Sequence, residues 1–154
     1  PEQPAPICAA LAAYAAEANV SLADFEVVVD TGLLARDPER AREFLARLAD
    51  LGVGRVLRAF GGAAAALQAA TEYCWSTVEL DVDVVQDLSR GGPRAVVVQG
   101  LVQMARALTF QDRAVGVVSA ADVAAMRAVG VSQILGTPAH HALPTPVGRQ
   151  LSVG

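Results

Sequence analysis

Residues 55–67, RVLRAFGGAAAAL, combine a strand, a glycine turn and the start of a helix in the order typical of a ligand site. In parallel α/β sheets the carboxyl ends of the strands open onto a shared crevice, where ligands usually bind. The predicted strand ends in Arg58, Ala59 and Phe60. A guanidinium at that position could bind a ligand phosphate, or it could form an ion pair with a carboxylate of a neighbouring strand.

Two acids, Glu79 and Asp81, follow on the next predicted strand at residues 76–82. Three interpretations of Arg58 remain open: an internal ion pair with Glu79 or Asp81, a contact with a ligand phosphate, and a solvated surface arginine. A divalent cation beside Arg58 would be repelled by about 8 kcal/mol at ~4 Å and an effective dielectric constant of ~20. The two acids neither offset this repulsion nor complete a coordination shell, so we predict no metal and no cofactor.

Other reactive residue types form no recognisable constellation. Cys8 and Cys74 lie far apart and outside any C-x-x-C pattern, which is typical of buried thiols in a reducing compartment. The adjacent residues His140 and His141 tend to point apart on an extended segment, so we predict no metal pair there. The chain contains no lysine, which excludes Schiff-base chemistry, and no P-loop, G-x-G-x-x-G or H-E-x-x-H motif.

The elements that would position these residues alternate between strand and helix. Apolar and β-branched runs predict five strands, at residues 24–30, 54–60, 76–82, 113–119 and 132–136. Periodicity and capping residues predict the main helices at 7–18, 38–51, 62–73, 94–110 and 120–130. Alternation predicts parallel strands with helical crossovers, and five strands are too few to close an eight-stranded barrel. The predicted fold class is therefore α/β, an incomplete TIM-like barrel.

Composition limits the class of protein further. With 154 residues, 53% hydrophobic and 18% charged, the chain can form one globular domain, which we place at residues 1–146 with a C-terminal tail at 147–154. The net charge of −4 argues against a nucleic-acid partner. We recognise no signal peptide and no apolar run of ~20 residues, and therefore predict a cytoplasmic protein without membrane contact. The missing initiator methionine suggests a segment of a longer polypeptide, and the amino-acid usage is typical of a GC-rich bacterial genome.

Five stretches carry a family resemblance: DTGLLARDPERA (30–41), LARLADLGVGRVLRAFGGAAAAL (45–67), VELDVDVVQDL (78–88), VGVVSAADVAAMRAVGVSQILG (115–136) and HALP (141–144). In order and spacing they resemble the EAL-type cyclic di-GMP phosphodiesterase domain, over about residues 3–146. In turn they are similar to its E-S-x-L-L-x-D-P-E segment, D-D-F-G-T-G loop, K-I-D-x-x-F-V-x-D-L stretch, E-G-V-E-T segment and R-P-L-P segment. The resemblance implies a TIM-like barrel that holds two divalent metal ions on strand-end carboxylates. The first strands of the family, with the E-A-L motif and a metal-binding asparagine, have no counterpart in this chain.

The sequence departs from the family at the positions where the resemblance places functional residues. These degenerate positions are Val27, Arg58, Ala59, Glu79, Val115, Val118 and Leu135. Arg58 and Ala59 replace both acids of the D-D-F-G loop, and Glu79 replaces the essential lysine, whereas Asp81 is kept. The metal-binding glutamate falls at Val27, or at Glu26 if the strand is shifted by one residue. These departures predict a degenerate domain that is not an enzyme.

Two functions are compatible with a degenerate domain of this kind. The first is a non-catalytic signalling or regulatory domain that acts through protein–protein interaction. Its partner would be another protein, the rest of the parent polypeptide, or a second copy packed on the small residues 63–66. The alternative is a receptor that binds cyclic di-GMP or another nucleotide without hydrolysis. Its candidate contacts are Arg58, Glu79, Asp81 and His141, the last because the resemblance places an arginine beside the ligand near that position.

Overall fold

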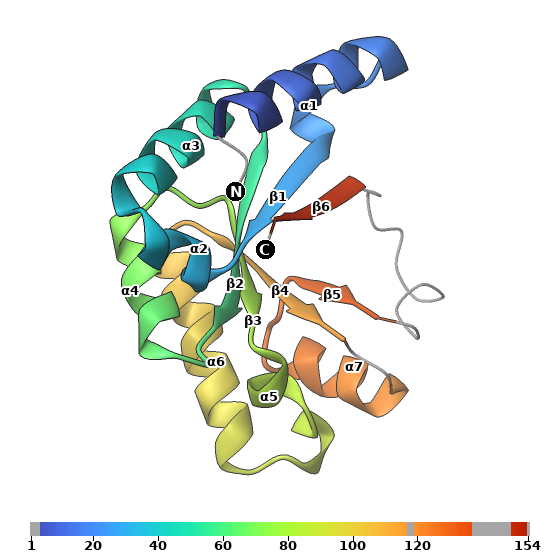
Figure 1. The fold of residues 1–154 in the computed structure, drawn as a ribbon. Helices are drawn as coiled ribbons and strands as arrows, with labels where there is room; N and C mark the ends of the chain where they lie inside the picture. Colours follow the sequence, from blue (N-terminus) through green and yellow to red (C-terminus); the bar gives the residue numbers. More distant parts are fainter. Residues whose placement is uncertain (1–3, 117–118, 137–148, 154) are drawn as a thin grey trace.

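The computed structural model describes residues 4–116, 119–136 and 149–153. Within these ranges, parallel strands form one sheet in the order β5-β4-β3-β2-β1-β6 (Figure 1). The strands are β1 (Phe25–Val29), β2 (Gly54–Phe60), β3 (Thr77–Leu80), β4 (Gln111–Val115), β5 (Gln133–Leu135) and β6 (Arg149–Val153). The first five are neighbours both along the chain and across the sheet, which confirms the predicted α/β class and the incomplete TIM-like barrel.

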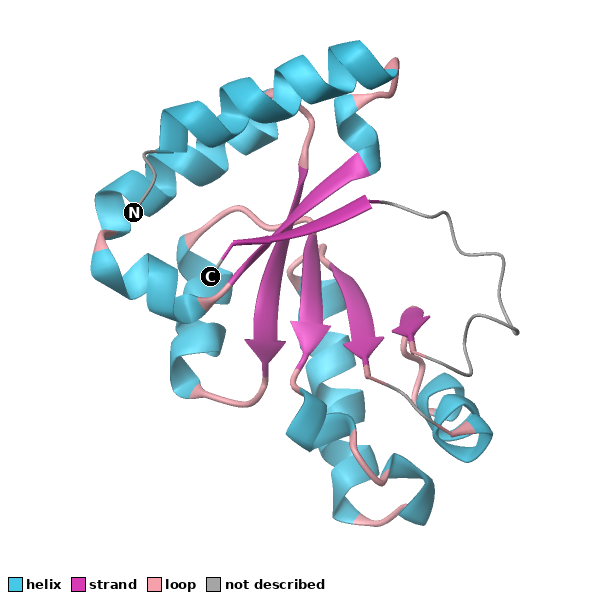
Figure 2. Ribbon diagram, turned by 45° about the vertical axis from the view of Figure 1, so that its right-hand side comes forward, coloured by secondary structure: helices cyan, strands magenta, loops and turns pink. Residues whose placement is uncertain are grey.

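Helices connect the strands and pack on one face of the sheet (Figure 2). The α-helices are α1 (Pro4–Ala18), α2 (Thr31–Arg36), α3 (Pro38–Asp50), α4 (Ala64–Glu72), α5 (Val82–Val85), α6 (Pro93–Ala107) and α7 (Ala120–Ala128), with short 3-10 helices η1 (Leu22–Asp24) and η2 (Leu88–Arg90). Strand side chains alternate between the two faces. Val27, Val29, Leu57 and Val78 therefore face the helices and belong to the hydrophobic core. The opposite face of the same strands carries Glu26 and Glu79 together with the buried side chains of Val28 and Val56.

The start of α3 shows how local signals set the element boundaries. The Oδ1 atom of Asp37 accepts a hydrogen bond from the Arg40 amide at 3.1 Å, and Pro38 occupies the first turn, where no amide hydrogen is needed. Phe44, Leu45 and Leu48 recur on one face and are buried against the sheet. These features confirm the helix predicted at this place.

The main differences from the prediction lie in three strands, and the helix predicted at 94–110 ends at Ala107. β3 ends at Leu80, because the side chain of Asp81 caps α5 instead of continuing the strand. β4 begins at Gln111, before the predicted start, and Gly116 with a φ of 74° follows its last residue. β6 lies within the segment predicted as a tail and pairs in parallel with β1. Backbone pairing with a distant strand leaves little trace in a short polar sequence, which is why β6 was missed.

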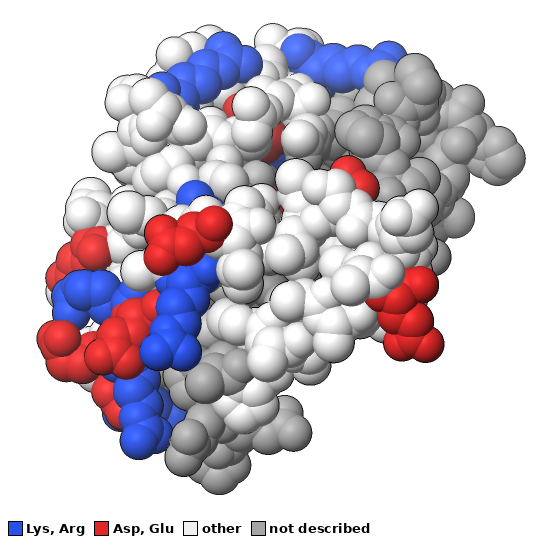
Figure 3. Space-filling model, turned by 90° about the horizontal axis from the view of Figure 1, so that it is seen from above, with Lys and Arg blue, Asp and Glu red and all other residues white. Residues whose placement is uncertain are grey.

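Most of the face seen in Figure 3 is uncharged, and acidic and basic side chains lie side by side mainly at its lower left. On α3, for example, ion pairs join Arg40 to Asp37 at 3.3 Å and Arg42 to Glu39 at 2.8 Å. This face therefore offers no extended basic surface of the kind that a nucleic acid requires. In the described ranges we find no helix that combines the length and the apolar character needed to cross a membrane.

Stability at acidic pH should depend on the capping box that begins α7. The Ser119 hydroxyl oxygen accepts a hydrogen bond from the Asp122 amide at 3.0 Å, and the hydroxyl donates one to the Asp122 carboxylate. The hydrogen bond from Ser119, followed by those from Ser89, holds the pKa of Asp122 below its ordinary value of 3.8. A carboxyl with a lowered pKa stabilises the folded state above its unfolded pKa, and this contribution is lost as the pH falls through the folded value.

We therefore expect Asp122→Asn to be less stable than the wild type at neutral pH. The difference should shrink as the pH is lowered below 3.8, because the wild-type carboxyl is then protonated as well. Urea unfolding of both proteins at a series of pH values measures this difference. A gap that stays constant over the acidic range would contradict the assignment.

Candidate functional site

The backbone turns sharply where β2 ends, at the carboxyl edge of the sheet. The pairing of β2 with β3 shifts register between Leu57 and Phe60, and Ala59 has a φ of 58°. A left-handed conformation costs a residue with a Cβ roughly 1–2 kcal/mol, so the surrounding structure must hold it in place. Gly61 follows with a φ of 90°, and the Gly62 amide donates to the Ala59 carbonyl at 3.1 Å. The turn predicted from Gly61 and Gly62 is present, and the strained backbone conformation lies at Ala59.

Asp81 packs against this turn and holds the start of α5. Its amide donates to the Phe60 carbonyl at 3.0 Å, and its Oδ1 accepts the Asp83 amide at 2.8 Å. A Cβ on Gly62 would lie 2.1 Å from the Asp81 Oδ2 atom, so the carboxylate occupies space that only a glycine leaves open. Asp81 therefore acts as a helix cap. Its role as a ligand contact stays a prediction.

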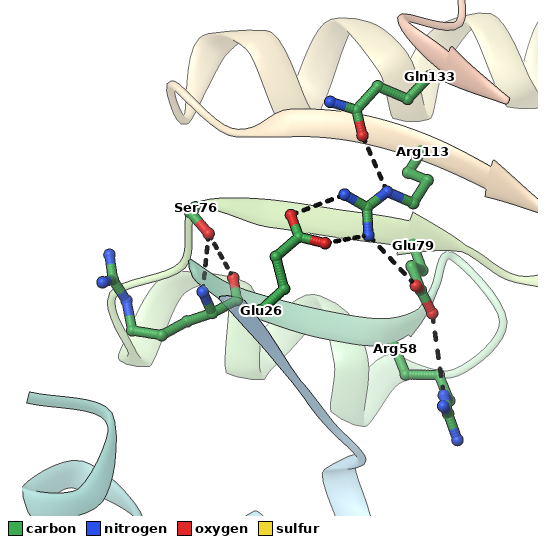
Figure 4. A network of polar contacts seen from close by, with 7 residues as sticks. Glu26, Arg58, Ser76, Glu79, Arg113 and Gln133 are labelled. Atoms are coloured by element: carbon green, nitrogen blue, oxygen red, sulfur yellow. Dashed lines mark hydrogen bonds and ion pairs between the residues drawn. The ribbon is translucent and has the colours of Figure 1, made fainter. Parts of the chain in front are cut away.

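Arg113 lies at the centre of a polar network on the face of the sheet that points away from the helices (Figure 4). Its Nη1 and Nη2 atoms lie 2.7 Å from the two carboxylate oxygens of Glu26, which makes a bidentate pair. Its Nε donates to the Gln133 side chain at 2.9 Å, and Nη1 lies 3.7 Å from Oε1 of Glu79. The side chains of Arg113 and Glu79 are 7% and 4% exposed. These charges have little contact with water and depend on one another.

Glu26 reaches Arg113 across two intervening strands, because β2 and β3 lie between β1 and β4. Gly54 is the register partner of Glu26 on β2, and a Cβ there would lie 2.9 Å from the Glu26 Cγ atom. The missing side chain at Gly54 thus leaves a path for the glutamate. Val27, the other position considered for the family's glutamate, faces the helices and is 1% exposed. Of these two positions, Glu26 is the one on the polar face.

Arg58 lies at the solvent-exposed end of this network. Its Nε atom is 3.9 Å from the Glu79 Oε2 atom, and its side chain is 45% exposed. A half-exposed pair at that distance contributes little stability, since water screens it. The interpretation of Arg58 as an internal ion pair is confirmed, with Glu79 as its partner. The contacts of Arg58 and Glu79 with a ligand are not tested by this geometry and stay predictions.

The residues of this face do not fit the two divalent ions that the family resemblance implies. The carboxylates of Glu26 and Glu79 both lie within ion-pair distance of Arg113. Divalent cations require several oxygen ligands, and a guanidinium beside those ligands repels the ion. In the part of the chain that the structure describes, no group of three or more His, Cys, Asp or Glu residues converges on one point. The carboxylates of this site are balanced by arginine.

The other predicted positions are only partly brought to this edge. Val115 and Leu135 end β4 and β5 and are partly buried, whereas Val118 and His141 lie outside the described residues. Sequence reasoning missed Arg113, the residue with the most polar contacts in the network. The available signal was a charged residue inside a strand predicted to be buried, because such a residue requires a partner.

Comparisons with known proteins agree with this architecture. The sequence matches the family model described as "EAL domain" over residues 2–138. The fold is similar to the Xanthomonas citri FimX EAL domain in complex with c-diGMP, at 15% identity and a TM-score of 0.77 over 85% of this chain and 52% of that chain. It is similar to the calcium/cy-diGMP complex of Klebsiella pneumoniae BlrP1, at 19% identity and a TM-score of 0.75 over 84% and 33%. It is also similar to the EAL enzyme Bd1971 with cAMP and cyclic-di-GMP bound, at 16% identity and a TM-score of 0.68 over 76% and 31%.

None of the curated proteins matches this chain. The shares of 31%, 33% and 52% show that the chain spans between about a third and about half of the similar solved chains. The EAL resemblance predicted from the sequence is confirmed by the match over residues 2–138.

The prediction that the chain is not an enzyme is wrong. The family model covers most of the chain, and one of the similar folds belongs to a protein described as an EAL enzyme. The prediction was based on a few strand-end positions, such as Arg58 and Val115, whose residues differ from those of the family. The chain also spans only part of the similar solved chains. A few substituted positions were not sufficient to exclude an enzyme, because the family model matches residues 2–138 as a whole.

Proposed function

Because the chain belongs to the EAL domain family, we propose that it acts in cyclic di-GMP signalling and recognises this dinucleotide at the carboxyl edge of β2, β3 and β4. The observation that carries the proposal is the guanidinium of Arg58, which is 45% exposed at that edge beside the strained turn at Ala59. Cyclic di-GMP presents phosphodiester anions, which arginine binds through charge-assisted hydrogen bonds. The solved FimX and BlrP1 structures contain this dinucleotide, which supports the choice of ligand.

The local charges favour an anion at this edge, although the chain carries a net charge of −4. The carboxylates of Glu26 and Glu79 lie within ion-pair distance of Arg113, and the side chains of these two glutamates are 24% and 4% exposed. The carboxylate of Asp81 accepts the Asp83 amide. Glu26, Glu79 and Asp81 thus have partners within the protein, while Asp83 on α5 is exposed. An approaching phosphate would meet the half-exposed guanidinium of Arg58 at this edge.

Isothermal titration of the chain with cyclic di-GMP tests the proposal, once with magnesium and once with a chelator. We expect saturable binding of the dinucleotide and none of GMP, which carries the same base without the cyclic diester. Cleavage is followed in the same samples, because the similar solved structures include an enzyme. No saturable heat at any attainable concentration would contradict the proposal.

A second candidate, protein–protein interaction, is favoured by an apolar stripe on α6. Val96, Val97 and Met104 on this helix are 69%, 52% and 42% exposed. Neighbouring exposed apolar residues often mark a contact with another protein. The partner protein and the homodimer expected on residues 63–66 stay predictions, and the stripe on α6 is the surface we propose for the partner protein.

A further inference from the structure

We infer that Arg58 binds a phosphate of the ligand directly, in the place of a divalent cation, and that buried Glu79 positions its guanidinium. This inference rests on the proposed function for the identity of the ligand. It goes further because it assigns to Arg58 the place of a divalent cation and names Glu79 as the residue that holds its guanidinium. Both are residues of this chain at which the family resemblance places other chemistry.

The first step of the argument is the division of charge within the network. Arg113 lies 2.7 Å from both carboxylate oxygens of Glu26, so the charges of these two residues balance. Glu79 then lies between two guanidiniums, 3.7 Å from Arg113 and 3.9 Å from Arg58. Two arginines and two glutamates therefore share the face, and the cationic end nearest solvent is Arg58. Positive charge reaches the edge through a side chain and requires no bound ion.

The second step is the position of Glu79. Its side chain is 4% exposed, so its carboxylate faces the interior and does not repel an anion that approaches from water. A buried acid of this kind can still hold the root of the guanidinium through Nε, while the side chain of Arg58 remains 45% exposed. A side chain restrained before binding loses less conformational entropy when the ligand arrives. Glu79 is thus a positioning residue and makes no contact with the ligand in this proposal.

The third step is the competition with a metal ion. A cation coordinated by Glu79 would lie close to both Arg58 and Arg113, and repulsion between these positive charges would oppose its binding. Arg58, whose side chain is 45% exposed, can instead bind a phosphate diester that approaches from water. The positive charge that binds a phosphate at this edge can therefore come from an arginine or from a divalent ion, and in this chain Arg58 supplies it.

The experiment is calorimetry with cyclic di-GMP in the presence of a chelator, on the wild type and three variants. We expect Arg58→Ala to weaken binding by roughly tenfold to a hundredfold, the usual effect of losing a charged hydrogen bond. Arg58→Lys should retain part of the affinity, because it keeps the charge and loses the planar geometry. Arg127→Ala is the matched control. It removes an exposed arginine from the last turn of α7. In a β-α-β unit the last turn of the helix lies near the amino ends of the strands, away from the carboxyl edge at which Arg58 lies.

A double-mutant cycle tests the role of Glu79. Glu79→Gln should weaken binding in the wild-type background and have no further effect in Arg58→Ala, because it acts through that arginine. Equal effects in both backgrounds would assign Glu79 a structural role only. Thermal unfolding of each variant, without ligand, shows whether the fold is retained.

The inference and the proposed function fail in different ways. If the wild type binds no dinucleotide under any condition, the proposed function fails. If the wild type binds only with magnesium, or if Arg58→Ala binds as tightly as the wild type, the function stands and the inference is overturned. Binding that survives the chelator and is lost with Arg58 supports both.

Discussion

Replacing Arg113 by methionine should lower the free energy of unfolding by about 3–5 kcal/mol, the usual cost of removing one partner of a buried ion pair. The arginine side chain is 7% exposed and bidentate to Glu26, and it also lies 3.7 Å from Glu79. Without the guanidinium, the carboxylates of Glu26 and Glu79 both lose the counter-charge of Arg113, whereas the ion pair of Glu79 with Arg58 is long and half exposed. Urea unfolding followed by circular dichroism measures the loss.

The loss of unfolding free energy should be partly reversed in the double variant Arg113→Met with Glu26→Gln, since one of the two carboxylates left without Arg113 is then neutral. Arg127→Met serves as the control, because this exposed arginine should change stability by no more than about 0.5 kcal/mol. A loss below about 1 kcal/mol for Arg113→Met, which is the scale of a surface pair, would mean that the network is not the buried cluster described above.

Replacing Gly61 by alanine should cost about 2–4 kcal/mol, the sum of backbone strain and overpacking. Its φ of 90° lies in the left-handed region, and a Cβ would lie 2.3 Å from the Leu101 Cδ1 atom. Leu101 is itself 7% exposed in the core, so it has little room to move away. The free energy of unfolding from urea titration gives the size of the effect, and the turn after β2 is the element that loses its geometry.

The same substitution at Gly100 should have the opposite sign. Gly100 lies inside α6, its φ is not in the left-handed region, and nothing lies within 4 Å of the position a Cβ would take. Alanine there should stabilise the protein by roughly 0.5–1 kcal/mol, because glycine loses more backbone entropy than alanine in a helix. Equal effects at both glycines would contradict the view that Gly61 is required by the turn.

Local signals were sufficient to predict most of the elements. Asp37 and Pro38 mark the start of α3, and Ser119 with Asp122 marks the start of α7, since each cap depends on residues within one turn. The alternation of strands and helices predicted the parallel sheet, because a parallel connection needs a crossover. Boundaries were less certain where one residue serves two elements, as Asp81 does after β3.

Only part of the candidate site could be predicted from the sequence before the fold was known. An ion pair of Arg58 with Glu79 or Asp81 could be expected in advance, because these acids lie on the next strand along the chain, and the structure shows Glu79 as the partner. Arg113 and Glu26 could not be paired, since 87 residues separate them and two strands lie between them in the sheet. The choice between Glu26 and Val27 depended on which face of β1 turns toward the helices. A shift of one residue reverses that choice.

The sequence by itself thus determined the class of fold, the order of the elements and the family, because periodicity, caps and motif spacing are properties of neighbouring residues. The tertiary structure alone decided which side chains share the polar face and how their charges are balanced. Gly54 shows the physical reason: its missing side chain matters only because Glu26 passes over it to reach Arg113. A contact of that kind exists only once the sheet has brought distant strands together.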